Sequence, residues 1–295
     1  MQRRRRTIIT LIAGPGAGRH LPRIAAELSG ALGAQADFLA AGIACDIACD
    51  GSREAAEAAA RGTVGDRPID IVVQPAQGRR KRLLVADFEA TIIENEMLEE
   101  LADFLGMRAH VADITRRAMN AEIDFVDALA ERVALLRGLP ASVLDAAARR
   151  IRLMPGARAL IATLRRAGVH TALVSGGFAV FAEPVAQALG FDRVVCNRLA
   201  LDGDRLAGTL APPIVTGATK HETLVALAAE LGLTLGQTMA VGDGANDLPM
   251  LQTAGLGIAF RAKPMVAAAV RWRIDHADLT ALLYAQGYRR DEIVT

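Results

Sequence analysis

The sequence predicts an α/β protein in which a doubly wound parallel sheet follows a smaller ferredoxin-like α+β unit. After Pro155 and Gly156, helices alternate with short apolar strands, which is the order of a doubly wound sheet. Between Thr7 and Gln74 the order is strand, helix, strand, strand, helix, strand, which is the ferredoxin-like arrangement. The length of 295 residues also favours two domains, because a single core stops growing at roughly 250–300 residues.

The first unit is predicted to occupy residues 1–78. Its elements are a strand from Thr7, a helix, two short strands around Phe38 to Ala48, an Ala-rich helix around Glu54 to Arg61, and a strand from Ile69 to Val73. Turn-forming and basic residues then run from Gln74 to Arg82, which is typical of a linker. We therefore expect residues 79–295 to form the second domain, and a fragment that begins near Arg79 to fold by itself and to retain the activity of the chain.

The second domain is predicted to begin with a buried strand, Leu83 to Ala86. Apolar residues then recur at helical spacing, which predicts a helical insertion at about residues 94–151. An Asp-Gly turn between Leu199 and Leu210 predicts a projecting hairpin. The remaining predicted elements are a helix to Ala167, strand Thr171–Val174, a helix to Leu189, strand Arg193–Cys196, helix Lys220–Leu231, strand Met239–Val241 and strand Leu256–Ala259.

Composition excludes several classes of protein. The 34 Lys and Arg residues nearly balance the 33 Asp and Glu residues, so a generally basic nucleic-acid-binding protein is disfavoured. Gly, Pro or a charged residue interrupts every apolar run before it is long enough for a membrane helix. The cysteines are three in number and lack metal-ligand spacing, so neither a disulfide framework nor a zinc site is indicated. We expect a cytoplasmic protein.

Polar residues stand at the ends of three predicted strands, where open α/β sheets bind their ligands. Asp87 and Glu89 follow the first strand, Ser175 and Gly176 end the second, and an acidic loop from Asp243 follows the third. Each group taken singly is also compatible with ordinary turn chemistry. Their ordered combination indicates a functional site at this edge of the sheet, where the amides of the Ser175–Gly176 turn can face an anion.

The same residues carry a resemblance to a known family. The motifs Asp87–Thr91, Val174–Phe178, Lys220 and Val241–Asp247 resemble the ordered motifs of haloacid-dehalogenase-like phosphatases. Within them, the stretches 95–101, 131–140 and 197–199 look like the phosphoserine phosphatase subfamily. The resemblance extends from about Leu83 to Tyr288 and implies a Rossmann-like core with a helical cap.

This resemblance implies hydrolysis of O-phospho-L-serine to L-serine and phosphate, the last step of L-serine biosynthesis, by a phosphoric monoester hydrolase. Asp87 would be the nucleophile that forms an aspartyl phosphate, while Lys220 offsets its charge. Mg²⁺ would be held by Asp87, Asp243 and the backbone oxygen of Glu89. Asp247 would orient Lys220 or a metal-bound water. Ser175 and the Gly176 amide would hold the phosphoryl oxygens.

Glu89 departs from the family pattern, in which an aspartate usually transfers the proton at this position. A glutamate can be the same general acid and base, but its extra methylene moves the carboxyl group. Some similar proteins with this glutamate transfer phosphate from phosphoserine to homoserine. The alternatives are therefore a phosphoserine:homoserine phosphotransferase, or an amino-acid-binding homologue with impaired catalysis.

The resemblance also implies how the substrate is selected. Glu96 would bind the ammonium group and Arg132 the carboxylate of phosphoserine. Phe125 would cover the entrance, and Asn246 would contact the substrate. The first unit resembles the regulatory ACT-type modules that accompany some of these enzymes, which implies either an amino-acid effector or a homodimer interface. We expect no nucleic acid and no membrane among the partners.

Overall fold

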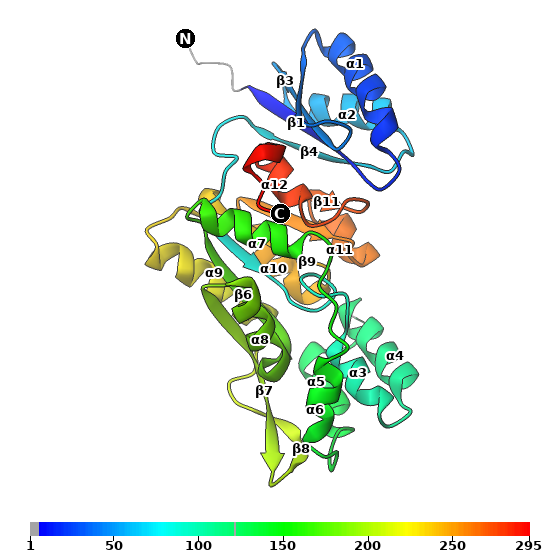
Figure 1. Ribbon diagram of the computed structural model, residues 1–295, viewed down its shortest axis with the longest axis vertical. Helices are drawn as coiled ribbons and strands as arrows, with labels where there is room; N and C mark the ends of the chain where they lie inside the picture. Colours follow the sequence, from blue (N-terminus) through cyan, green and yellow to red (C-terminus); the bar gives the residue numbers. More distant parts are fainter. Residues whose placement is uncertain (1–5, 121) are drawn as a thin grey trace.

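The computed structural model describes residues 6–120 and 122–295 and contains two β-sheets (Figure 1). The smaller sheet has the strand order β2-β3-β1-β4, and β1 runs antiparallel to both of its neighbours. Its elements follow the predicted order of strands and helices: β1 (Thr7–Ala13), α1 (Leu21–Leu32), β2 (Ala36–Ala40), β3 (Ala44–Cys49), α2 (Arg53–Val64) and β4 (Ile69–Pro75). Local sequence sets these boundaries. The Ser52 hydroxyl, for example, accepts the N–H of Ala55 and so starts α2.

The larger sheet has the strand order β11-β10-β9-β5-β6-β7-β8. Its strands are β5 (Leu83–Ala86), β6 (His170–Phe178), β7 (Arg193–Asp202), β8 (Arg205–Ala211), β9 (Thr238–Gly242), β10 (Leu256–Phe260) and β11 (Trp272–Ile274). All neighbouring pairs are parallel except β7 and β8, so the sheet is mixed and not wholly parallel as expected. The reason is that the predicted hairpin is continuous with β7 and adds an antiparallel edge strand.

Ten helices of four residues or more accompany the larger sheet in the described part of the chain. They are α3 (Met97–Asp103), α4 (Arg108–Met119), α5 (Phe125–Ala134), α6 (Ser142–Ala148), α7 (Ala157–Arg166), α8 (Ala179–Leu189), α9 (Gly217–Glu230), α10 (Leu248–Thr253), α11 (Pro264–Ala269) and α12 (Ala281–Ala285). The first four lie between β5 and β6 and form the cap. The sequence did not predict α10, α11, α12 or β11, because elements this short show almost no periodicity.

The cap is attached to the β7–β8 hairpin as well as to the core. The N–H of Gly138, in the loop after α5, donates to the carbonyl of Leu206 at 2.9 Å, and the N–H of Leu206 donates to Leu139 at 2.8 Å. Gly208 lies close to the carboxyl end of α5, since a Cβ there would lie 3.2 Å from the Ala134 carbonyl oxygen. Cap and hairpin are therefore packed as neighbours, as Figure 1 shows for α5, α6 and β8.

The smaller sheet packs directly on the carboxyl-terminal part of the chain. Figure 1 shows β4 beside β11 and α12. The Asp70 carboxylate on β4 accepts the N–H groups of Asp275 and Ala277 at 2.8 Å each, and the Trp272 indole N–H donates to the Val73 carbonyl at 2.9 Å. These bonds satisfy backbone groups of both units.

Apolar side chains continue across the same boundary. Ile12 and Val72, on the face of the smaller sheet opposite α1 and α2, belong to one buried cluster with Leu282 and Tyr284 of α12. The other face of that sheet forms a separate cluster with α1 and α2. The smaller sheet is thus covered on both faces. No helix in the described residues combines the length and the apolar character that a membrane crossing requires.

Candidate active site

Three strand ends meet at one edge of the larger sheet. Strand β5 lies between β9 and β6, and the three run parallel. Asp87 follows β5, Ser175 lies near the end of β6, and Asp243 follows β9. Parallel strands present their carboxyl ends at the same edge, which is where such sheets bind ligands. The structure therefore brings the three predicted motifs together.

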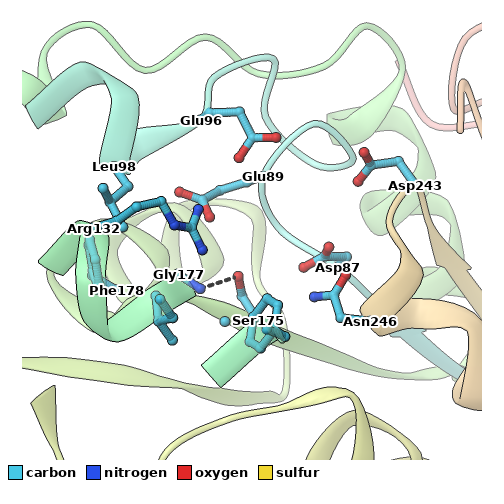
Figure 2. Close-up of a pocket in the computed structure, with 13 residues that line it drawn as sticks. Asp87, Glu89, Glu96, Leu98, Arg132, Ser175, Gly177, Phe178, Asp243 and Asn246 are labelled. Carbon is cyan, nitrogen blue, oxygen red and sulfur yellow. Dashed lines mark hydrogen bonds between the residues drawn. The ribbon is translucent and has the colours of Figure 1, made fainter. Parts of the chain in front are cut away.

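A pocket lies between this edge and the cap (Figure 2). It is lined by Asp87, Glu89, Glu96, Leu98, Phe125, Leu129, Arg132, Ser175, Gly176, Gly177, Phe178, Asp243 and Asn246. Among the predicted site residues, only Lys220 and Asp247 are not on its wall. Both are fully buried, and Lys220 contacts the pocket residue Asp87 from inside the protein.

Lys220 is held between two carboxylates. Its Nζ lies 2.7 Å from Asp87 Oδ1 and 2.6 Å from Asp247 Oδ1. The residue sits in the first turn of α9, which begins after Thr216 with a side-chain cap. Burial alone lowers the pKa of Lys220, but the nearby charges of Asp247 and Asp87 outweigh it and raise the pKa above its usual value. Lys220 is therefore a fixed positive charge beside Asp87.

Asp87, Asp243 and Asp247 form a buried acidic cluster. Each offers an oxygen within 4.8 Å of the other two. Asp247 is already engaged, because its Oδ2 accepts the N–H groups of Asp243 and Gly244 at 3.1 and 3.0 Å. Gly242 permits this arrangement, since a Cβ there would lie 2.4 Å from the Asp247 carboxylate. Asp87 and Asp243 are thus the better candidates for metal ligands.

The donor set fits a magnesium ion. Mg²⁺ prefers carboxylate oxygens and takes only one or two of them from the protein. Burial, the Asp247 charge and the Asp243 charge raise the pKa of Asp87 to about 8, against the opposing effect of Lys220. Burial, Glu96 and Asp247 similarly raise the pKa of Asp243 to about 7. A divalent cation would remove this excess of negative charge.

Glu89 is partly buried at the meeting point of core and cap. Its Oε1 accepts the N–H of Met97 at 2.8 Å, at the start of α3. Its Oε2 faces Gly177, where a Cβ would lie 2.8 Å away. Burial raises the pKa of Glu89 to about 7, despite the Met97 hydrogen bond, which lowers it. A carboxyl group that titrates near neutrality suits proton transfer in both directions.

The cap contributes one acidic and one basic side chain to the pocket. Burial and the Glu89 charge raise the pKa of Glu96 to about 8, while Lys263 opposes them. Arg132 is buried on α5, where its Nε donates to the Ala128 carbonyl at 2.9 Å and its Nη1 donates to Thr115 Oγ1 at 2.8 Å. Figure 2 shows its guanidinium directed into the pocket toward Glu89.

The remaining predicted residues close the pocket. Phe125 stands over Gly176, because a Cβ on that glycine would lie 3.0 Å from the Phe125 ring. The N–H of Gly177 donates to Ser175 Oγ at 2.9 Å, so the Ser175 hydroxyl hydrogen is free to donate to a ligand. Asn246 lies beside Asp87 on the pocket wall (Figure 2).

Several residues of this site were not predicted from the sequence. Leu98 and Leu129 supply apolar wall, and Lys263 Nζ lies 3.5 Å from Asp243 Oδ2. Leu129 could have been found, because its spacing from Phe125 and Arg132 puts all three on one helix face. Lys263 carries no comparable signal, since it reaches Asp243 only through the packing of β10 beside β9.

The chain is similar in sequence and in fold to known proteins. Residues 84–252 match the family model described as haloacid dehalogenase-like hydrolase. The chain is 45% identical over 215 residues to phosphoserine phosphatase SerB2 of Mycobacterium tuberculosis, covering 73% of this chain and 53% of that protein. It is also 45% identical over 203 residues to a phosphoserine phosphatase of Lactococcus lactis, covering 69% of this chain and 94% of that protein.

A solved structure resembles the whole architecture. The crystal structure of a HAD family hydrolase from Salmonella enterica serovar Typhi superposes with a TM-score of 0.82 at 28% identity, covering 95% of this chain and 98% of that one. By contrast, the chain spans little more than half the length of the first curated relatives, 53% of the Mycobacterium protein and 57% of a Streptomyces coelicolor phosphoserine phosphatase.

Proposed function

The chain belongs to the haloacid dehalogenase-like hydrolases, and we propose that it hydrolyses O-phospho-L-serine to L-serine and phosphate, the last step of L-serine biosynthesis. One observation carries the proposal. The acidic residue Glu96 and the basic residue Arg132 line the cap side of the same pocket that has Asp87 and Ser175 on its core side. Phosphoserine has an ammonium, a carboxylate and a phosphate, and each finds a group of suitable charge or hydrogen-bonding capacity there.

The proposed reaction proceeds in two displacements. An Asp87 oxygen attacks phosphorus and forms an aspartyl phosphate, while the bond from phosphorus to the serine oxygen breaks and Glu89 donates its proton to that oxygen. Glu89, now a carboxylate, then removes a proton from water, and the hydroxide oxygen attacks the aspartyl phosphate to release phosphate and regenerate Asp87. The pKa of about 7 for Glu89 matches both roles.

Charge stabilisation comes from groups already in place. Lys220, at 2.7 Å from Asp87, offsets the negative charge that accumulates when a carboxylate approaches a phosphate dianion. The Ser175 hydroxyl and the Gly176 N–H would donate to the phosphoryl oxygens. Asp87, Asp243 and the Glu89 main-chain oxygen would hold Mg²⁺, which supplies further positive charge beside the phosphate. Asp247 would keep Lys220 in position through their 2.6 Å contact.

Substrate selection is assigned to the cap. Glu96 would bind the ammonium group and Arg132 the carboxylate, with Phe125 closing the entrance and Asn246 touching the substrate. Thr115 and the Ala128 carbonyl fix the Arg132 side chain in advance, so little conformational entropy is lost when the carboxylate binds.

The decisive experiment is a phosphate-release screen of phosphorylated metabolites with Mg²⁺, with and without homoserine. The proposal expects free phosphate from O-phospho-L-serine in stoichiometric amount with serine. Phosphohomoserine in place of free phosphate would establish a phosphotransferase instead, and the longer Glu89 is the residue that raises this alternative. Absence of turnover with every substrate would indicate a binding homologue without catalysis.

For the amino-terminal residues we propose a ferredoxin-like, ACT-type domain within residues 1–78. The order β2-β3-β1-β4 with α1 and α2 on one face supports it. Because the opposite face already packs on α12, an effector or a second protomer would have to bind at an edge or at the helices. Titrating L-serine into the phosphatase assay tests the effector role, and sedimentation equilibrium tests dimerisation.

A further inference from the structure

Strand β6 is irregular at the point where it carries the predicted phosphate-binding residues. Ser175 is paired with Cys196 of β7, but the next paired residue is Phe178, opposite Asn197. The two glycines between Ser175 and Phe178 therefore have no partner in the ladder. Bulges of this kind re-aim backbone groups and are frequent beside active sites, yet they leave peptide groups that need other partners.

The Asn197 side chain supplies the missing partner. It is fully buried, its Nδ2 donates to the Gly176 carbonyl at 2.7 Å, and its Oδ1 accepts the Val215 N–H at 2.8 Å. The orientation of the amide is fixed, because a carbonyl can only accept and a backbone N–H can only donate. Both ends of the Asn197 amide are thus used by two different loops.

The first contact acts on the phosphate-binding groups. The Gly176 carbonyl belongs to the same peptide unit as the Gly177 N–H, and that N–H donates to Ser175 Oγ at 2.9 Å. A peptide unit is planar, so holding its carbonyl also fixes the direction of its N–H. Asn197 therefore sets the position of the Ser175 hydroxyl through one rigid group.

The second contact acts on the segment that carries the lysine. Val215 immediately precedes Thr216, the N-cap of α9, and the Thr216 carbonyl accepts the Lys220 N–H at 3.1 Å. Val215 is itself buried, so the start of α9 is fixed relative to Asn197. One side chain consequently joins the two elements that must contact the same phosphoryl group.

We propose that Asn197 is a positioning residue that sets the distance between the Ser175–Gly176 phosphate-binding loop and Lys220. The inference rests on the proposed phosphoryl chemistry of the pocket, and it adds a residue that touches neither substrate nor metal. Its signature is a specific loss of phosphate affinity when the Gly176 contact is broken.

Asn197→Asp tests the proposal, because the variant keeps the shape and the acceptor for Val215 but replaces the donor by an oxygen that faces the Gly176 carbonyl. Binding of inorganic phosphate in the presence of Mg²⁺ is measured by calorimetry, together with kcat, KM and the thermal midpoint. Loss of one buried hydrogen bond predicts a fall in phosphate affinity of about ten-fold or more. Asn197→Ser, which is too short to span both contacts, should show the same loss.

Thr171→Val is the matched control. Thr171 is buried at the opposite end of β6, and its hydroxyl bonds to Asp192 Oδ2 at 3.0 Å. This variant should lower the thermal midpoint comparably and leave phosphate affinity unchanged. Unchanged phosphate affinity in both Asn197 variants would overturn the proposal, as would failure of both variants to fold, which would assign the residue to the core.

Inorganic phosphate keeps this test separate from the identity of the substrate. If the unsubstituted protein binds phosphate but does not hydrolyse phosphoserine, the proposed function fails, and the Asn197 comparison still decides the positioning role. If the unsubstituted protein hydrolyses phosphoserine normally and the Asn197 variants bind phosphate with unchanged affinity, the positioning role alone fails.

Discussion

The Glu89 carboxylate accepts the N–H of Met97 at 2.8 Å and thereby joins the loop after β5 to the first residue of cap helix α3. The group proposed to transfer the proton is therefore also a contact between core and cap. A shorter aspartate would not span this distance without a shift of the backbone. The additional methylene of Glu89 therefore helps to hold the cap on the core, whatever its effect on the choice between water and homoserine as phosphoryl acceptor.

Glu89→Gln separates the two roles of this side chain. The amide oxygen still accepts the Met97 N–H, but the proton transfer is lost, so kcat should fall by about 10²–10⁴-fold with little change in thermal midpoint. Steady-state kinetics and calorimetry measure both quantities. Glu89→Asp is the control, since it keeps a carboxyl group and should retain more turnover than Gln. Unchanged kcat in Glu89→Gln would exclude the acid and base assignment.

Asp87→Asn should abolish formation of the phosphoenzyme. An amide oxygen is a poor nucleophile, and the Lys220–Asp247 contact remains to hold the local structure. Acid quench during turnover followed by mass spectrometry detects the aspartyl phosphate. Asp145→Asn, at an exposed position on α6, is the control and should behave as the unsubstituted protein. A trapped phosphoenzyme in Asp87→Asn would disprove Asp87 as the nucleophile.

Arg132→Ala should reduce kcat/KM for phosphoserine by an amount equivalent to about 2 kcal/mol or more, because a desolvated carboxylate loses its partner. A small aryl phosphate, which has no carboxylate, should be spared. Thr115→Val removes only the 2.8 Å contact to Nη1 and should give a smaller loss in the same direction. Equal losses for the two substrates would mean that Arg132 serves the fold.

Stability without metal should fall as the pH rises from about 4 to 8. The folded-state pKa values of Glu89, Asp243 and Asp87 are raised to about 7, 7 and 8, so the native state holds protons that the unfolded chain releases above about pH 4. The stabilisation they give is present at low pH and is lost as the pH passes through 7 to 8.

Urea unfolding in EDTA at several pH values measures this effect. Asp87→Asn removes one of the titrating groups, so its unfolding free energy should decrease less steeply with pH. Mg²⁺ should stabilise the unsubstituted protein most at the alkaline end, where the carboxylates are charged. An identical pH slope in the two proteins would refute the raised pKa of Asp87.

Asp70→Ala should destabilise the whole chain by about 3 kcal/mol, since hydrogen bonds to a buried charged group are lost. The carboxylate now accepts the N–H groups of Asp275, His276 and Ala277. Chemical denaturation measures the loss, and Asp66→Ala, an exposed residue of the same unit, is the control.

A fragment that begins at Arg79 lacks the Asp70 contacts and should therefore be less stable than the full chain or insoluble, which is the opposite of the expectation from sequence. A fragment as stable as the full chain would contradict this view of the interface.

The family and the position of the polar residues at the strand ends could be predicted from the sequence. Asp87, Ser175 and Asp243 each follow a short apolar strand, and the rule that parallel strands end at one edge predicted that they would meet. The order of strands and helices in the smaller unit could also be predicted, because elements of that length have clear periodicity. The cap residues Glu96 and Arg132 depended on family resemblance, since no local pattern marks them.

Contacts between distant parts of the chain depend on the folded structure and could not be predicted from the sequence. Asp70 and Ala277 are 207 positions apart, and nothing local to Asp70 reveals that its carboxylate will bind a turn of the other unit. The contacts of Asn197 could not be predicted either, because they depend on a bulge in the neighbouring strand β6 and on the loop before α9. Periodicity reports which face of an element is apolar, but a buried polar side chain is specified by the partners that packing brings to it.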